Sequence, residues 1–190
     1  MSISLTKGQR ISLTKEFAGL TNLQVGLGWD PVKQGILRRT PDIDLDASVF
    51  QLDADGKMQD CIYFGHLQSA TGAIVHTGDN LTGEGEGDDE TIYVSLSKIP
   101  ENTARLVFAV NIYAARNRSQ HFGMIRNAYI RLMDRSNGRE LCRYNLTDDY
   151  KDMTSLIVAE VYRHDGEWMF SAVGRGTTDG SLGELSARYK

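Results

Sequence analysis

The segment 78–90 holds the side chains best suited to bind a metal ion. It reads Gly-Asp-Asn-Leu-Thr-Gly-Glu-Gly-Glu-Gly-Asp-Asp-Glu, which contains six carboxylates and four glycines but no Lys or Arg. Calcium takes about six to eight oxygen ligands, and glycine lets a backbone fold closely around an ion. Two like charges about 4 Å apart repel each other by about 1 kcal/mol even in water. We therefore expect a divalent cation to order this segment.

The same composition also fits a solvated acidic linker, which is the commoner role of an acidic, glycine-rich stretch. Three features favour metal binding here. Strand-like sequence flanks the segment closely on both sides, Asn80 and Thr82 add neutral oxygen donors, and a second acidic motif lies upstream.

That second motif, residues 42–46, alternates Asp with apolar residues. In an extended strand its three carboxylates would project from one face. The alternative is a solvent-facing edge strand, where charges discourage aggregation. Asp30, which follows Gly26-Leu27-Gly28-Trp29, lies beside another loop and would join the same cluster. If these loops meet at one end of a sheet, they supply more oxygen donors than one Ca²⁺ needs, so we expect two ions.

An enzymatic alternative uses the same carboxylates. Asp44 and Asp46, with the later acids of residues 87–89, superficially match Mg²⁺-dependent phosphoryl-transfer enzymes in which one Asp attacks phosphorus. Such a site needs an apolar parallel strand before the first motif and strand–helix alternation after it. Here residues 38–41 (Arg-Arg-Thr-Pro) precede the motif, and hairpin patterns follow it. We therefore expect a binding protein rather than an enzyme.

Length and composition predict one domain over residues 1–190, since 190 residues with 41% hydrophobic content can bury one substantial core. The net charge of -4 argues against general nucleic-acid binding, which depends on Lys and Arg neutralising phosphates. No secretory signal and no apolar run of about 18 residues is readable, so we expect a cytoplasmic protein that is not itself embedded in a membrane. Cys61 and Cys142 lack metal-ligand spacing and are expected to be small buried hydrophobes.

Short runs that alternate apolar and polar residues, separated by close turn signals, fill most of the chain. This pattern predicts an all-β fold, an antiparallel β-sandwich of about ten short strands. Residues 3–7 and 11–15 repeat the motif Ile-Ser-Leu-Thr-Lys around a Gly-containing connection, which predicts a hairpin. Helical periodicity is scarce, and one or two short helices are expected near residues 114–122 and 183–189.

In the segment 76–90 and the motifs 26–30 and 44–48, the sequence resembles the TerD family of tellurium-resistance proteins, and the resemblance runs nearly from end to end. The resemblance implies a β-sandwich that binds Ca²⁺ at one end through acidic loops, in the cytoplasm of bacteria that respond to tellurite and other stresses. We expect the partners to be other stress-response proteins, in a complex that associates with the membrane. Ala114 departs from the family pattern, because relatives often carry an acid there.

Carried onto this sequence, the resemblance implies a set of oxygen donors for Ca²⁺. The expected metal ligands are Asp30, Asp44, Asp46, Asp79, Asn80, Gly83, Gly85, Asp88, Asp89 and Glu90. Calcium would order the acidic loops and so create a surface for a partner protein. We also expect the side chains of Asp88 and Asp89 to point away from the core, so that replacing both with Asn leaves the apo fold intact.

Overall fold

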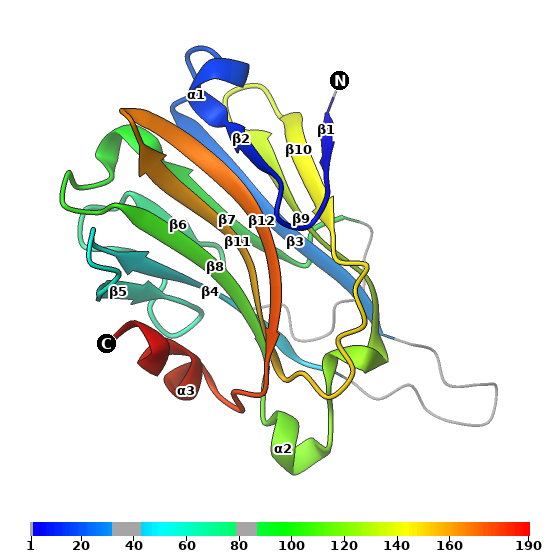
Figure 1. Cartoon of the computed structure of the whole chain (residues 1–190). Helices are drawn as coiled ribbons and strands as arrows, with labels where there is room; N and C mark the ends of the chain where they lie inside the picture. The colour runs from blue at the N-terminus through cyan, green and yellow to red at the C-terminus, as the bar shows by residue number, and fades with distance from the viewer. Residues whose placement is uncertain (1, 32–42, 79–86) are drawn as a thin grey trace.

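Two six-stranded sheets form the protein (Figure 1), and the computed structural model describes residues 2–31, 43–78 and 87–190. The first sheet contains, in spatial order, β1 (Ile3–Leu5), β10 (Arg139–Asn145), β9 (Ile125–Asp134), β3 (Asn22–Pro31), β7 (Glu90–Ser95) and β6 (Ile74–His76). The second contains β2 (Arg10–Ser12), β12 (Glu167–Thr177), β11 (Ser155–His164), β8 (Arg105–Ile112), β4 (Leu45–Leu52) and β5 (Met58–Ile62). The predicted all-β sandwich is confirmed, with twelve strands in the described part of the chain instead of about ten.

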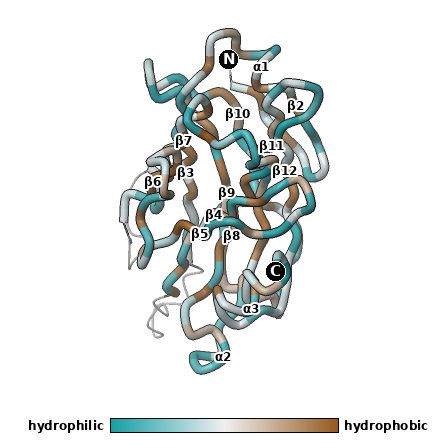
Figure 2. Tube along the Cα trace, turned by 90° about the vertical axis from the view of Figure 1, so that its left-hand side faces the viewer, coloured by the Kyte–Doolittle hydropathy of each residue, from teal (hydrophilic) through white to brown (hydrophobic). Residues whose placement is uncertain are grey.

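Alternation along the strands places the core between the sheets. In β7, Glu90, Ile92 and Val94 are buried while the residues between them are half-buried. Apolar residues of both sheets meet in one cluster, for example Val25 of β3 and Phe108 of β8. Figure 2 shows the hydrophobic residues along the inner strands and hydrophilic ones at many of the turns.

The helices are short. They are α1 (Leu13–Glu16), α2 (Ala115–Arg118) and α3 (Leu182–Ser186), with 3-10 turns at Leu96–Lys98, Phe122–Met124 and Ala187–Tyr189. The C-terminal turns cover the outer face of the second sheet, where Leu185 packs into a second apolar cluster with Phe50 and Ile157. The two helical regions predicted from the sequence are therefore confirmed.

The predicted N-terminal hairpin is wrong. Strand β1 pairs in parallel with β10 of the first sheet, whereas β2 pairs antiparallel with β12 of the second. The second copy of the repeat continues into α1, because the Ser12 side chain accepts a hydrogen bond from the backbone N–H of Lys15 and caps the helix. A five-residue repeat cannot reveal that its two copies find their partners in opposite sheets.

Three strand ends that flank the acidic segments lie at the same end of the sandwich. The register pairs Leu27, near the end of β3, with Glu90, the first residue of β7. The start of β4 lies beside Glu90, because Glu90 Oε2 accepts a hydrogen bond of 2.8 Å from the backbone N–H of Ala47. Across the described residues, no helix is long and apolar enough to span a bilayer.

Candidate functional site

The two glycines of the motif 26–30 make room for side chains on the outer face of the first sheet. Their neighbours Val25 and Leu27 point into the core, so Gly26 and Gly28 face outward. A Cβ atom on Gly26 would overlap the Asp88 carboxylate, and one on Gly28 would overlap the Tyr129 ring. Asp88 and Tyr129 therefore lie directly across the bare backbone of β3.

Asp88 is held by an ion pair rather than exposed to solvent. Arg131 donates to it from Nε at 2.7 Å and from Nη2 at 3.1 Å, and the Tyr129 hydroxyl donates to Oδ1 at 3.0 Å. The side chain of Asp88 is only 6% exposed. The hydrogen bond to Asp88 raises the pKa of Arg131, while burial and the nearby carboxylate raise the pKa of Tyr129 to about 12. Asp88 lies on the outer face of the first sheet, away from the core, as predicted. That its replacement leaves the apo fold intact stays a prediction, and the ion pair with Arg131 argues against it.

Asp89 and Asp30 line a hollow of about 350 Å³ beside this ion pair. Asp89 Oδ2 accepts a hydrogen bond of 2.8 Å from the backbone N–H of Trp29, and Asp30 Oδ2 accepts one of 2.8 Å from Asn127. Burial raises the pKa of Asp89, the Trp29 N–H opposes that shift, and the charges of Asp30, Asp88 and Glu90 add to it. Arg131 and Arg143 line the same hollow, so carboxylates and guanidinium groups meet where β3 ends and β7 begins.

Glu90 is buried between the sheets. Besides the backbone N–H of Ala47, its Oε2 meets Nε2 of His76 at 3.2 Å, and both side chains are almost fully buried. His76 Nδ1 accepts a hydrogen bond from the backbone N–H of Gly78, so the ring proton lies on Nε2 and points to Glu90. This contact links the two edges of the acidic segment across 14 residues of sequence.

Asp44 and Asp46 enter the second sheet at the start of β4. Leu45 and Ala47 point into the core, which places the two carboxylates on the opposite, outer face. Asp46 is only 6% exposed and accepts a hydrogen bond of 3.4 Å from Asn111, so a freely solvated strand edge does not describe it. It lines a hollow of its own and not the one that holds Asp30 and Asp89.

The structure thus brings together part of the predicted ligand set. Asp30, Asp88, Asp89 and Glu90 lie at neighbouring positions, while Asp79, Asn80, Gly83 and Gly85 lie outside the described residues. Within the ranges 2–31, 43–78 and 87–190, no group of three or more His, Cys, Asp or Glu is arranged to hold a metal ion. The ligand set remains a prediction.

The environment of Asp44 and Asp46 bears on the phosphoryl-transfer alternative. Strand β4 pairs antiparallel with both β5 and β8. The alternative needs a parallel strand before this motif and a helix soon after it. In the parts of the chain that the structure describes, no such strand precedes the motif and no such helix follows it.

Sequence reasoning missed three residues that organise this site. These residues are His76, Tyr129 and Arg131, and none of them belongs to a motif with a recognisable spacing. A usable signal exists in the pair Gly26 and Gly28, because two outward-facing glycines on one strand indicate that large or charged groups lie across it.

Fold and site together define a two-sheet β-sandwich with carboxylates gathered at one end. The family model for the TerD domain matches residues 1–189. The chain is 54% identical, over 100% of both chains, to the stress response protein SCP2 of Bacillus subtilis (strain 168). It is 43% identical to the tellurium resistance protein TerD of Serratia marcescens, over 100% of this chain and 97% of that protein.

A solved structure supports the same fold. The crystal structure of a homologue of telluride resistance protein (TerD) from Streptomyces coelicolor A3(2) matches with a TM-score of 0.65 and 24% identity, covering 87% of this chain and 98% of that one. The chain belongs to the TerD family, which contains tellurium-resistance and stress-response proteins.

Proposed function

We propose that this protein is a non-enzymatic, cytoplasmic Ca²⁺-binding stress-response protein. In this proposal, Ca²⁺ orders the acidic segments at one end of the sandwich and so forms a surface for a partner protein, such as a component of a membrane-associated stress complex. Membership of the TerD family supports the role in stress response and tellurium resistance.

One observation carries the metal part of the proposal. Asp30 and Asp89 line one hollow, and the charges of Asp88 and Glu90 act on Asp89 there. Carboxylate oxygens are the donors that Ca²⁺ prefers, and a cation would offset their mutual repulsion. The donor set therefore fits calcium. Asp30 and Asp89, with the acidic segment 79–86, would hold the ion, and Asp44, Asp46, Asp88 and Glu90 remain candidates.

Scanning calorimetry tests this proposal. Ligand that binds only the folded state stabilises it by about 2.7 kcal/mol at a hundredfold excess over Kd. We expect the melting temperature to rise when millimolar Ca²⁺ replaces EGTA, and to rise much less in Asp89→Asn. The exposed turn variant Asp55→Asn is the matched control and should keep the full response. An unchanged melting temperature in the natural protein would contradict calcium binding.

Two further measurements separate this proposal from its alternatives. A phosphoryl-transfer enzyme would hydrolyse p-nitrophenyl phosphate with Mg²⁺, and Asp44→Asn would abolish the turnover. We expect no turnover with either metal. Crosslinking in cell extract tests the partner surface, because the proposal expects a crosslinked partner with Ca²⁺ that is lost with EGTA and in Asp89→Asn.

A further inference from the structure

A third hollow, of about 140 Å³, lies between the 3-10 turn Phe122–Met124, the start of β9 and the connection from β10 to β11. We call it the outer hollow. Apolar side chains line much of it, among them Phe122 and Leu156, which are 5% and 1% exposed, and the half-buried Leu146. Charged side chains complete the lining, so one cavity offers both an apolar wall and ionic groups.

Arg126 and Asp149 bring opposite charges to the outer hollow and do not pair with each other. Arg126 is exposed and forms no hydrogen bond or ion pair with a described residue, although it stands opposite Asp30 in the register of β3 and β9. Asp149 accepts one hydrogen bond from the backbone, on Oδ1. The other acid of the lining, Asp148, is already paired with Lys7. Arg126 and Oδ2 of Asp149 therefore remain for a ligand.

The outer hollow adjoins a smaller one between the two sheets, the inner hollow, of about 20 Å³. Four residues line both, namely Phe122, Ala128, Leu146 and Leu156. A cavity needs about 10–15 Å³ to hold one water molecule, so the inner hollow has room for one small group. Its lining is mainly aliphatic and aromatic and includes Trp29.

Trp29 leaves a hydrogen-bond donor unused beside the inner hollow. The residue is 6% exposed, and its buried Nε1 has no acceptor among the residues that the structure describes. Such a group is uncommon in a folded protein and calls for an explanation. A water molecule needs two to four polar partners, and the Tyr129 hydroxyl is already engaged by Gly87 and Asp88. An apolar group that accepts one weak hydrogen bond, such as a thioether, suits the inner hollow better.

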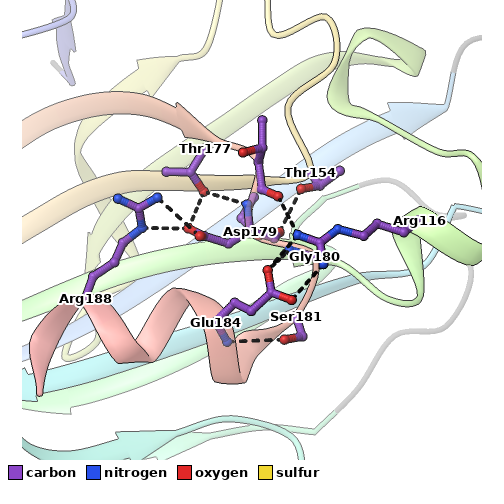
Figure 3. A network of polar contacts seen from close by, with 10 residues as sticks. Arg116, Thr154, Thr177, Asp179, Gly180, Ser181, Glu184 and Arg188 are labelled. Carbon is purple, nitrogen blue, oxygen red and sulfur yellow. Dashed lines mark hydrogen bonds and ion pairs between the residues drawn. The ribbon is translucent and has the colours of Figure 1, made fainter.

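The connection that carries Asp148 and Asp149 is held in place at its far end. The backbone N–H of Phe122 donates to the carbonyl of Met153 at 2.8 Å. Thr154 Oγ1 donates to the backbone carbonyl of Asp179 at 2.7 Å, and the Asp179 carboxylate is bound by Arg188 (Figure 3). The outer hollow is therefore preorganised by contacts that a ligand does not have to supply.

We propose that the outer and inner hollows together bind a free α-amino acid with an unbranched apolar side chain, and that methionine fits best. Arg126 binds the α-carboxylate and Asp149 the α-ammonium group, through charge-assisted hydrogen bonds. The side chain lies on Phe122 and Leu156, and its sulfur accepts the hydrogen bond of the Trp29 indole.

Other classes of ligand match fewer of these groups. An inorganic anion would meet the Asp149 charge and leave the apolar wall to water, and a metal cation would meet Arg126. A fatty acid would leave the Asp149 carboxylate without a cation. The proposal goes beyond calcium binding, because none of the expected calcium ligands lines either hollow.

NMR titration of the whole chain in EGTA tests the proposal with methionine itself. The chain has two tryptophans, so the variant Trp168→Phe assigns their indole N–H resonances. We expect the Trp29 resonance to shift saturably with a Kd of about 1 mM, while that of Trp168 stays in place. Norleucine, which has CH₂ in place of sulfur, should bind about threefold more weakly. The methionine analogues without the amino group and without the carboxyl group should each bind about tenfold more weakly.

Two variants at exposed positions locate the charged groups. Arg126→Gln should weaken methionine about tenfold and leave the analogue without the carboxyl group unaffected. Asp149→Asn should do the same for methionine and spare the analogue without the amino group. Arg139→Gln, at an exposed position outside both hollows, is the matched control and should change nothing. A Trp29 resonance that does not move with methionine, or full binding to both variants, overturns the proposal.

The same titration in millimolar Ca²⁺ separates this site from the calcium proposal. We expect the same affinity for methionine in Ca²⁺ and in EGTA. Displacement of methionine by Ca²⁺ would assign Asp149 to a metal and overturn the amino-acid site. A protein that binds methionine and is not stabilised by Ca²⁺ in calorimetry would overturn the calcium proposal alone.

Discussion

Oε2 of Glu90 in the first sheet accepts a hydrogen bond of 2.8 Å from the backbone N–H of Ala47 in the second. The same oxygen meets Nε2 of His76 at 3.2 Å, and Glu90 is 2% exposed. One carboxylate therefore joins the two sheets at the end where the acidic segments leave them.

Replacing Glu90 with Ala should destabilise the protein by about 3 kcal/mol, because a buried donor that loses its acceptor costs about 1–3 kcal/mol and two donors are affected. Glu90→Gln should lose less, since the amide oxygen still accepts one bond. Urea denaturation in EGTA measures the loss of stability in both variants, with a variant at an exposed position, Glu101→Ala, as control. A loss below about 0.5 kcal/mol for Glu90→Ala would mean that the contact does not link the sheets.

The ion pair between Asp88 and Arg131 should stabilise the apo protein. Its hydrogen bonds are charge-assisted and its side chains are mostly buried, at 6% and 24% exposure. A double-mutant cycle with Asp88→Asn and Arg131→Met should give a coupling energy of about 2 kcal/mol without calcium. Coupling close to zero would support the expectation that Asp88 is dispensable for the apo fold.

Gly26 should tolerate a side chain only when Asp88 is shortened. A methyl group at this position overlaps the carboxylate that Arg131 and Tyr129 hold in place. Gly26→Ala should cost about 1–3 kcal/mol in the natural protein and much less in an Asp88→Ala background. Equal losses in both backgrounds, measured by thermal denaturation, would show that the glycine serves another purpose.

Ala114 adopts a left-handed conformation, with φ at 51°. A residue with a Cβ atom costs about 1–2 kcal/mol in this conformation. Ala114→Gly should therefore raise the free energy of unfolding by about 1 kcal/mol, after the greater freedom of glycine in the unfolded chain is counted. Ala115→Gly, inside α2, is the opposite control and should lower the free energy of unfolding. A destabilised Ala114→Gly variant would contradict the argument.

The C-terminal segment 179–190 should detach in acid. Hydrogen bonds from the backbone of Gly180 and from Arg116 lower the pKa of Glu184. Burial pushes the pKa of Asp179 upward, but hydrogen bonds from Arg188 and Thr177 outweigh it and lower the pKa overall. Stability from such carboxylates is fully present above their unfolded pKa, near 4.5 and 3.8, and is lost as pH falls through the lower folded values.

Hydrogen exchange measures this detachment. After correction for intrinsic rates, amides of residues 182–189 should lose protection between pH 5 and pH 2 while those of β8 keep it. Glu184→Gln should weaken the pH dependence, because the amide does not titrate. Protection that stays constant over this range would contradict the role of the two carboxylates.

Sequence patterns predicted the sandwich, because turn residues and period-two alternation depend on local chemistry. The sequence also predicted that Asp30, Asp88 and Asp89 lie near one another, because each of them stands where a loop joins a strand. The pattern could not show that Arg131 neutralises Asp88, since that contact joins positions 43 residues apart. The pattern also could not show that Asp46 and Asp30 line different hollows. Their positions depend on the sheet to which each strand belongs and on the face of that sheet from which the side chain projects.

The pairing of the first strands has a consequence for biosynthesis. Strand β1 lies beside residues 142–144, and β2 lies beside residues 169–171. As the ribosome releases this chain, β1 and β2 must wait for partner strands that are made much later. Each sheet is therefore completed late, and a truncated product that lacks β12 would emerge with β2 unpaired and prone to aggregate.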